Sequence, residues 1–203
     1  MKQFLILSIS VILIGCSENR LIYDELTNKG TEDFPIMYYE GELFNGVALS
    51  NYSSSKGGQL EMEHHYKDGK KDGWCKRYYQ KSQLRWEGNY KAGVLGNRKS
   101  YFKNGKIKQE IEVISEGEYN KKIYHLNGQM RSDGNYKEGK GKWKLWKEHG
   151  IHKTWQDDGN ITREGNYIDG KKDGVHKEWY NGELRRERIY KEDVCITNVY
   201  NYY

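Results

Sequence analysis

A segment of about 25 residues recurs along the chain and constrains the fold more than any other feature of the sequence. Residues 66–90 read YKDGKKDGWCKRYYQKSQLRWEGNY, and residues 167–190 return to the same pattern as YIDGKKDGVHKEWYNGELRRERIY. Degenerate copies lie between these two. Recurrence at a period of this size indicates a repeat array, in which each unit packs mainly against its neighbours in the sequence.

Each copy has the pattern of a β-hairpin. A tyrosine ends the second strand of most copies, and a glycine three residues later marks the return turn to the next copy. Asparagine-glycine or aspartate-glycine pairs lie between the two strands of four copies, and such pairs favour tight turns because both residues accept positive φ. The four pairs are Asn104-Gly105, Asn127-Gly128, Asp158-Gly159 and Asn181-Gly182.

We therefore predict an all-β fold, an elongated single-layer antiparallel sheet of about six stacked hairpins. The array spans residues 38–190. Its copies run over residues 38–65, 66–89, 90–118, 119–135, 136–166 and 167–189. The fourth copy is short and the fifth has about seven extra residues, so we expect irregularity there. Residues 191–203 are β-prone, and we expect them to cap the last hairpin edge, which would otherwise be open to aggregation.

The consensus Y-x-D-G-K-x-x-G-x-x-K-x-Y/W-Y-x-N-G-x-L resembles the MORN repeat in its bacterial variant form. The resemblance covers about residues 38–190. Proteins of this shape are often labelled YwqK-type antitoxins of toxin–antitoxin systems. The resemblance implies a single-layer sheet of stacked hairpins, and it implies roles in membrane association and protein binding.

The N-terminal residues indicate export. Residues 1–15, MKQFLILSISVILIG, have a basic start and a short apolar run, which is the pattern of a secretory signal. The run ends in Leu13-Ile14-Gly15-Cys16, which looks like a bacterial lipobox with Cys16 as the lipidated residue; the alternative is an ordinary signal peptide with a coincidental cysteine. Ser17 resembles the sorting signal for the outer membrane. We expect a lipid-anchored envelope protein, with residues 16–37 as the lipidated cysteine and a polar tether.

The composition is unusual for a globular chain of 203 residues, with 35% hydrophobic residues, 31% charged residues and 18 tyrosines. Such values can indicate disorder, but the recurring aromatic residues and turn glycines favour an ordered sheet that is wet on at least one face. The net charge of +5 comes from interleaved positive and negative residues. This pattern gives no reason to expect a nucleic-acid partner.

Strict alternation along the strands predicts two different faces. First strands place a lysine beside an aromatic residue, and we single out this strip as a candidate ligand site: Lys76, Tyr78, Lys99, Tyr101, Lys153, Trp155, Lys177 and Trp179. The lysine stems can simply cover the rings, or the strip can bind an anionic surface. The opposite face should carry an acidic column: Glu63, Glu87, Glu110, Asp133, Glu164 and Glu187. We expect that column to pair across the strands with Cys75, Arg98, His152 and His176.

No enzyme site is expected. A catalytic site is one asymmetric constellation, whereas the carboxylate and histidine columns recur once per hairpin, about 10 Å apart. Ligands of a metal ion must converge on one point, which these columns do not do. The sequence therefore predicts no catalytic residues, no metal and no cofactor.

Three functions are compatible with these features. The first is a non-enzymatic, lipid-anchored repeat scaffold that binds another protein of the bacterial envelope. The second, from the resemblance, is an antitoxin or immunity-like protein that neutralises a toxin. The third is binding of anionic lipid or glycan by the aromatic and lysine strip.

Overall fold

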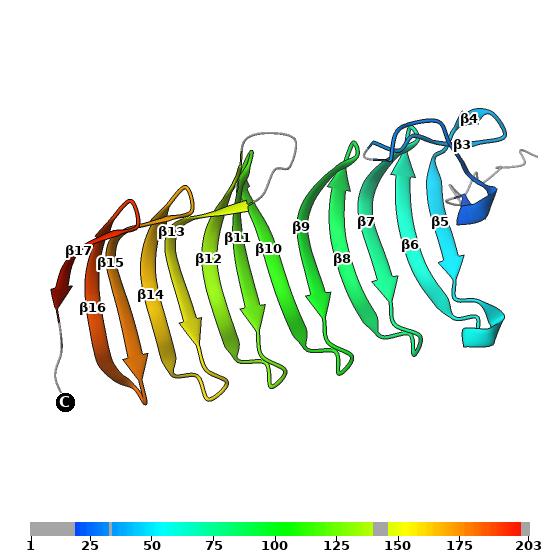
Figure 1. The fold of residues 1–203 in the computed structure, drawn as a ribbon. Helices are drawn as coiled ribbons and strands as arrows, with labels where there is room; N and C mark the ends of the chain where they lie inside the picture. Colours follow the sequence, from blue (N-terminus) through cyan, green and yellow to red (C-terminus); the bar gives the residue numbers. More distant parts are fainter. Residues whose placement is uncertain (1–18, 33, 140–145, 200–203) are drawn as a thin grey trace, which may run out of the picture.

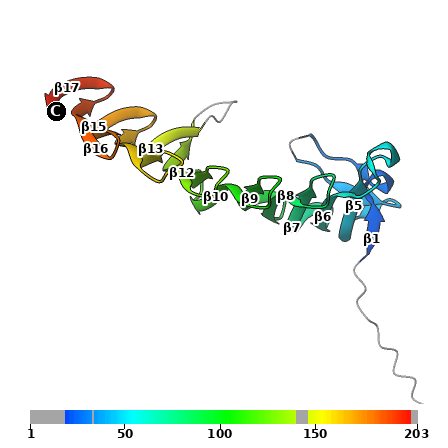
Figure 2. The ribbon, with the colours of Figure 1, turned by 90° about the horizontal axis from the view of Figure 1, so that it is seen from below.

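The computed structural model describes residues 19–32, 34–139 and 146–199, and the chain is all-β over these residues. Fourteen strands form one long open sheet in the order β1-β5-β6-β7-β8-β9-β10-β11-β12-β13-β14-β15-β16-β17, and a second sheet has the order β2-β3-β4 (Figure 1). The long sheet forms an elongated single layer (Figure 2). This confirms the predicted fold class.

The long sheet consists of six antiparallel hairpins flanked by one strand at each end. The hairpin strands are β5 (Gly46–Asn51) with β6 (Leu60–Lys67), β7 (Lys70–Tyr78) with β8 (Leu84–Lys91), β9 (Val94–Tyr101) with β10 (Ile107–Ser115), β11 (Glu118–Tyr124) with β12 (Met130–Glu138), β13 (Trp146–Trp155) with β14 (Ile161–Ile168), and β15 (Lys171–Tyr180) with β16 (Glu183–Lys191). The flanking strands are β1 (Arg20–Ile22), parallel to β5, and β17 (Val194–Val199), antiparallel to β16.

The turns at the two ends of the hairpins differ in type. Two-residue return turns have positive φ at both residues, as at Asp169 (φ 51°) and Gly170 (φ 85°). The asparagine-glycine and aspartate-glycine turns were expected to share this geometry. Of these four pairs, only Asn181-Gly182 has positive φ at both residues. In the other three, the first residue has negative φ and its side-chain oxygen accepts a hydrogen bond from the backbone N–H two residues later, as Asn104 does from Lys106 at 3.1 Å. These three turns are therefore longer loops with a side-chain cap.

A β-bulge near the turn of each hairpin decides which columns face each other. On the second strand, the residue after the leading aliphatic one has no partner in the register, so Trp179 pairs with Leu184 but Glu178 pairs with Arg186. The same slip occurs in all six hairpins, and the extra residues are Glu61, Arg85, Lys108, Arg131, Thr162 and Arg185. A one-residue slip moves every later side chain to the other face.

The bulge overturns the predicted pairing of the acidic column. Glu87 pairs with Lys76 and Lys99, and Glu164 pairs with Lys153 and Lys177, so the acidic and lysine columns share one face. We call this the ion-pair face. The residues expected to oppose the acids lie on the other face: Cys75, Arg98, His152 and His176. That face also carries Tyr66, Tyr90, Tyr136, Tyr167 and Tyr190, and we call it the tyrosine face.

The N-terminal segment is folded where a polar tether was expected. After β1 come a 3-10 turn, η1 (Tyr23–Glu25), and the small sheet of β2 (Thr27–Asn28), β3 (Met37–Tyr39) and β4 (Glu42–Leu43). The segment packs on the tyrosine face of the first hairpin and buries a cluster of Met37, Phe44, Ala48 and Tyr66, with Leu21, Tyr23, Leu26 and Tyr39 around it. The apolar side chains of this core are scattered through the segment. Their spacing forms no regular pattern, so the sequence did not predict a core here.

The predicted signal sequence, Cys16 and Ser17 lie outside the described residues. Within the described residues, we find no helix with the length and apolar character needed to cross a membrane.

Candidate functional site

The lysine and aromatic strip singled out from the sequence lies on the ion-pair face, in β7, β9, β13 and β15. Three of its lysines contact carboxylates. Lys99 Nζ lies 2.8 Å from Glu110, Lys153 Nζ lies 3.0 Å from Glu164, and Lys177 Nζ lies 3.6 Å from Glu187. These lysines are therefore neutralised by neighbours in the sheet, and the strip is a ladder of ion pairs rather than a row of uncompensated cations.

The tyrosines of the same face are also bound to the acidic column. The Tyr101 hydroxyl donates a hydrogen bond to Glu87 at 2.6 Å, and the Tyr124 hydroxyl donates one to Glu110 at 2.5 Å. Hydrogen bonds from Lys99 and Tyr124 hold the pKa of Glu110 below its ordinary value. Each of these carboxylates joins neighbouring hairpins, so the structure gives this face a role in holding the repeats together.

The tyrosine face carries a continuous ladder of aromatic rings across the C-terminal hairpins. Tyr136, His152, Tyr167, His176 and Tyr190 alternate along it, with neighbouring ring centroids 4.9–5.1 Å apart and planes inclined by 68–79°. Edge-to-face contacts at this separation are favourable for aromatic pairs. The sequence analysis did not predict this ladder, because strict alternation along the strands places the histidines and the tyrosines on different faces.

Glycines and backbone carbonyls fix the two histidine rings of the ladder. Gly165 pairs with both His152 and His176 across neighbouring strands, and it leaves room for a ring to lie over the sheet. His152 Nε2 donates to the carbonyl of Asn135 at 2.6 Å, and His176 Nε2 donates to that of Asn166 at 2.8 Å. The carbonyls only accept hydrogen bonds, so Nε2 carries the proton in both rings. Burial lowers the pKa of His176 below its ordinary value.

Cations lie over the tyrosine rings along this face. Lys71 Nζ is 5.2 Å from the centroid of Tyr90, Lys121 Nζ is 5.7 Å from Tyr136, and Lys172 Nζ is 4.9 Å from Tyr190. The guanidinium of Arg98 lies 5.1 Å from a ring centroid of Trp146, which itself stacks on Tyr119 at 4.6 Å. The cation–aromatic pattern that the sequence suggested is therefore present, but on the tyrosine face and with different lysines.

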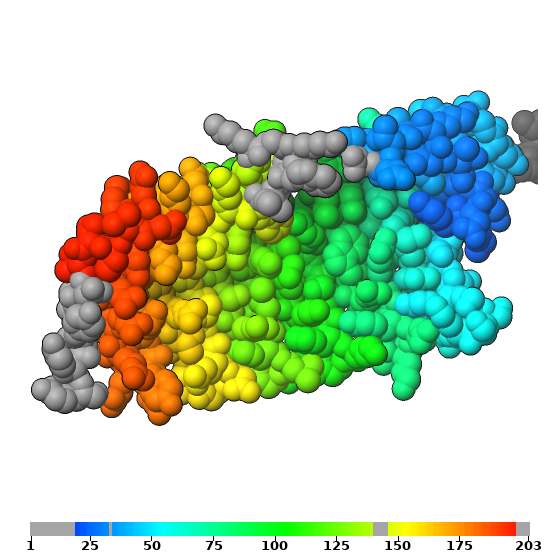
Figure 3. Space-filling view, in the orientation of Figure 1, coloured from blue at the N-terminus to red at the C-terminus, as the bar shows by residue number. Residues whose placement is uncertain are grey.

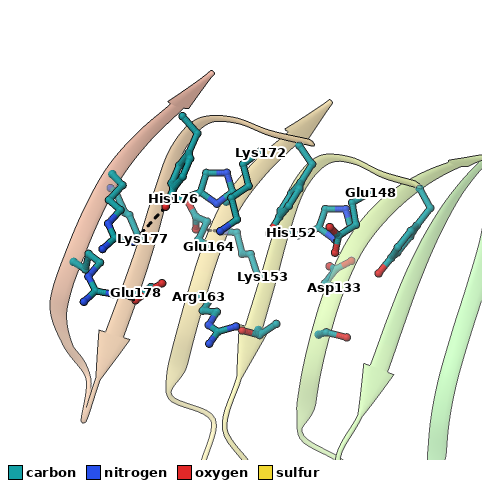
Figure 4. A pocket seen from close by; sticks show the side chains of 18 residues that line it. Asp133, Glu148, His152, Lys153, Arg163, Glu164, Lys172, His176, Lys177 and Glu178 are labelled. Carbon is teal, nitrogen blue, oxygen red and sulfur yellow. Dashed lines mark hydrogen bonds and ion pairs between the residues drawn. The ribbon is translucent and has the colours of Figure 1, made fainter. Parts of the chain in front are cut away.

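A hollow of about 290 Å³ lies on the tyrosine face over β12–β16 (Figure 4). The ring ladder forms one side of it, and charged side chains complete the lining, among them Glu148, Arg163, Lys172, Glu178 and Arg188. Figure 4 shows His152 and His176 on neighbouring hairpins, with Arg163 below them. We call this hollow, with its lining, the C-terminal groove.

The two histidines of the groove are engaged by the backbone. Among residues 19–32, 34–139 and 146–199, no group of three or more histidine, cysteine, aspartate or glutamate side chains is placed to hold a metal ion. The ring nitrogens of His152 and His176 that carry protons are bound to backbone carbonyls rather than to a nucleophile. The geometry suits recognition of a ligand by stacking and charge.

Comparison with known proteins supports the repeat assignment. The family model described as MORN repeat variant matches residues 95–115, 120–138 and 148–169. These segments coincide with the third, fourth and fifth hairpins, β9–β10, β11–β12 and β13–β14. Fold and matches together define an all-β hairpin-repeat protein in which three of the hairpins, β9–β10, β11–β12 and β13–β14, match the MORN repeat variant.

Other comparisons add little. No curated protein matches the chain. A solved structure, the crystal structure of a GtfA/B complex bound to UDP and GlcNAc, aligns over 71% of this chain and 26% of that chain, with 11% identity and a TM-score of 0.22. The chain thus spans about a quarter of that protein's length.

Proposed function

We propose that this protein is a non-enzymatic repeat scaffold that binds another protein of the bacterial envelope, where a lipid on Cys16 anchors it. MORN repeats are in general scaffolds that bind proteins or membranes. An elongated sheet of six hairpins offers a large surface for such contacts.

The contrast between the two faces is the observation that carries the proposal. On the ion-pair face, lysines and tyrosines satisfy the acidic column within the sheet, as Lys153 does for Glu164. On the tyrosine face over β12–β16, aromatic rings and cations line a hollow. Aromatic and arginine side chains are the residue types that contribute most to binding at protein interfaces.

A crosslinked pull-down of the membrane-anchored protein, followed by mass spectrometry, tests this function. One dominant envelope protein in the captured material is the expected result, and its absence from a strain lacking the bait is the control. Capture of no reproducible protein would contradict the proposal. A captured protein that is toxic when expressed alone would identify the antitoxin function instead.

The anchor has its own test. Cys16→Ser removes the sulfur that would carry the lipid, and we expect the variant to leave the membrane fraction while the wild-type chain stays in it. Equal membrane association of the two forms would refute lipid anchoring through Cys16 and would leave the scaffold function standing.

A further inference from the structure

We infer that the C-terminal groove binds an extended acidic segment of the partner protein. This inference rests on the proposed scaffold function and assigns the place and the chemistry of the contact. Three kinds of observation support it: the charge of the groove, the polypeptide that already covers the other end of the same face, and the dimensions of the ring ladder.

Six lysine and arginine side chains and four carboxylates line the groove, so its lining carries a net positive charge. Glu178 is bound to Arg186 at 3.1 Å, and Glu148 lies 3.8 Å from His152. Among the described residues, Arg163, Lys172 and Arg188 make no ion pair within 4.0 Å. Arg163 is exposed, and Lys172 lies over the Tyr190 ring. Carboxylates are the complementary ligand for such cations.

The other end of the tyrosine face already holds polypeptide. The ring of Tyr23 contacts that of His64 edge-on, with centroids 6.4 Å apart, and Met37 is buried against Tyr66. Tyr66 and Tyr167 are equivalent positions, each three residues before a return-turn glycine. The N-terminal segment, with its 3-10 turn and small sheet, thus shows that this face accepts further polypeptide (Figure 3, blue). Over β12–β16, the residues of the described chain that line the C-terminal groove all belong to strands of the long sheet.

The ladder has the length of a short peptide. Five neighbouring strands carry it, and at a strand spacing of about 4.8 Å the outer two lie roughly 19 Å apart. An extended chain rises about 3.3 Å per residue, so about six residues span this distance. A segment that alternates acidic and small residues would place carboxylates on the cation side and its backbone over the rings.

The test uses the full-length chain in neutral detergent and a fluorescent 12-residue peptide of alternating glutamate and alanine. The double variant Arg163→Gln with Lys172→Gln removes two charges of the groove. The matched control, Lys76→Gln with Lys99→Gln, removes two charges from the ion-pair face of two neighbouring hairpins, and neither residue lines the groove. Fluorescence anisotropy gives the Kd of each protein, and thermal melting shows that each variant is folded.

We expect the groove variant to weaken binding at least tenfold and the control variant to stay within about twofold of wild type. The same peptide with glutamine in place of glutamate should bind at least tenfold more weakly. No binding by the wild-type chain, or equal loss in both double variants, overturns the inference. Binding to a sulfated hexasaccharide or to phosphatidylglycerol vesicles that needs Arg163 and Lys172, without peptide binding, also overturns it because the ligand class is then wrong.

The pull-down separates this inference from the proposed function. If the groove variant still captures the same envelope protein as the wild type, the scaffold function stands and the groove is not its binding site. If the groove variant alone loses that protein, both are supported.

Discussion

His176 lies so close to Gly165 that a Cβ atom added to this glycine would be 2.2 Å from the histidine Nδ1 atom. His152 and Gly134 stand in the same relation one hairpin earlier, also at 2.2 Å. These two glycines have no positive φ, so their backbone would tolerate other residues. Their role is to leave space for the rings of the ladder.

Gly165→Ala should therefore destabilise the fold through a steric clash. The new methyl group would displace the His176 ring from its contacts with Tyr167 and Tyr190, and we expect a loss of about 1–3 kcal/mol in the free energy of unfolding. Urea denaturation measures this. In a His176→Ala background the same glycine substitution should cost little, and an equal cost in both backgrounds would show that the ring is not the cause.

Tyr101→Phe should also destabilise the fold, through loss of the hydroxyl that binds Glu87. A hydrogen bond to a charged group contributes about 1.5–3 kcal/mol, and the site is only partly buried, so we expect a cost near the lower end of that range. Tyr78→Phe is the matched control, because the Tyr78 hydroxyl makes no hydrogen bond to the described residues and occupies the equivalent position one hairpin earlier. Equal costs for the two variants would contradict this account.

Acidification should weaken the fold through His64, whose side chain is 3% exposed. Burial, with Lys71 and Arg77 nearby, lowers the pKa of His64 from 6.5 to about 3. The unfolded chain then binds a proton below pH 6.5 that the folded chain does not bind until about pH 3. The contribution of the neutral His64 to the free energy of unfolding is therefore fully present above pH 6.5. It falls as the pH is lowered, by up to about 2 kcal/mol at pH 5.

His64→Leu should flatten this pH dependence between pH 6.5 and pH 5. Urea denaturation at a series of pH values gives the slope for each protein. His176, whose pKa is lowered in the same direction, supplies part of the remaining slope. Identical slopes for the wild type and His64→Leu would show that His64 is not the responsible group.

Ala92→Asn should stabilise the fold. Ala92 has a φ of 48° in the return turn before β9, a conformation that costs an alanine roughly 1–2 kcal/mol and that asparagine tolerates better. Its backbone N–H bond to Asp72 at 3.0 Å does not depend on the side chain. We expect a gain of about 0.5–1 kcal/mol in thermal or urea unfolding. Asp169→Asn at the equivalent turn position should change the stability by less than this, which provides the control.

Most of the architecture could be predicted from the sequence because its signals are local. Each copy contains its own turn residues and strand residues, so the hairpins and their order follow from the repeat without knowledge of distant contacts. Lys153 and Trp155 share one face of the sheet with Lys177 and Trp179 for the same reason, since alternation within one strand needs no partner.

The pairing between columns could not be predicted in this way. Arg185 is extra in the register between β15 and β16, and this one-residue slip sets Lys177 opposite Glu187 and His176 opposite Arg188. The slip depends on how two strands pack, not on either strand alone. The strip singled out from the sequence therefore lies on the ion-pair face, while the ring ladder and the C-terminal groove lie on the tyrosine face.

The sequence by itself determined the repeat, the hairpins and the turn positions, because those depend on the conformational preferences of neighbouring residues. The tertiary structure decided the rest: the bulges that set the two faces apart, the tyrosine and histidine ladder, and the folding of the N-terminal segment onto Tyr66. These features arise from contacts between strands and between distant segments, whose geometry no single stretch of the chain encodes.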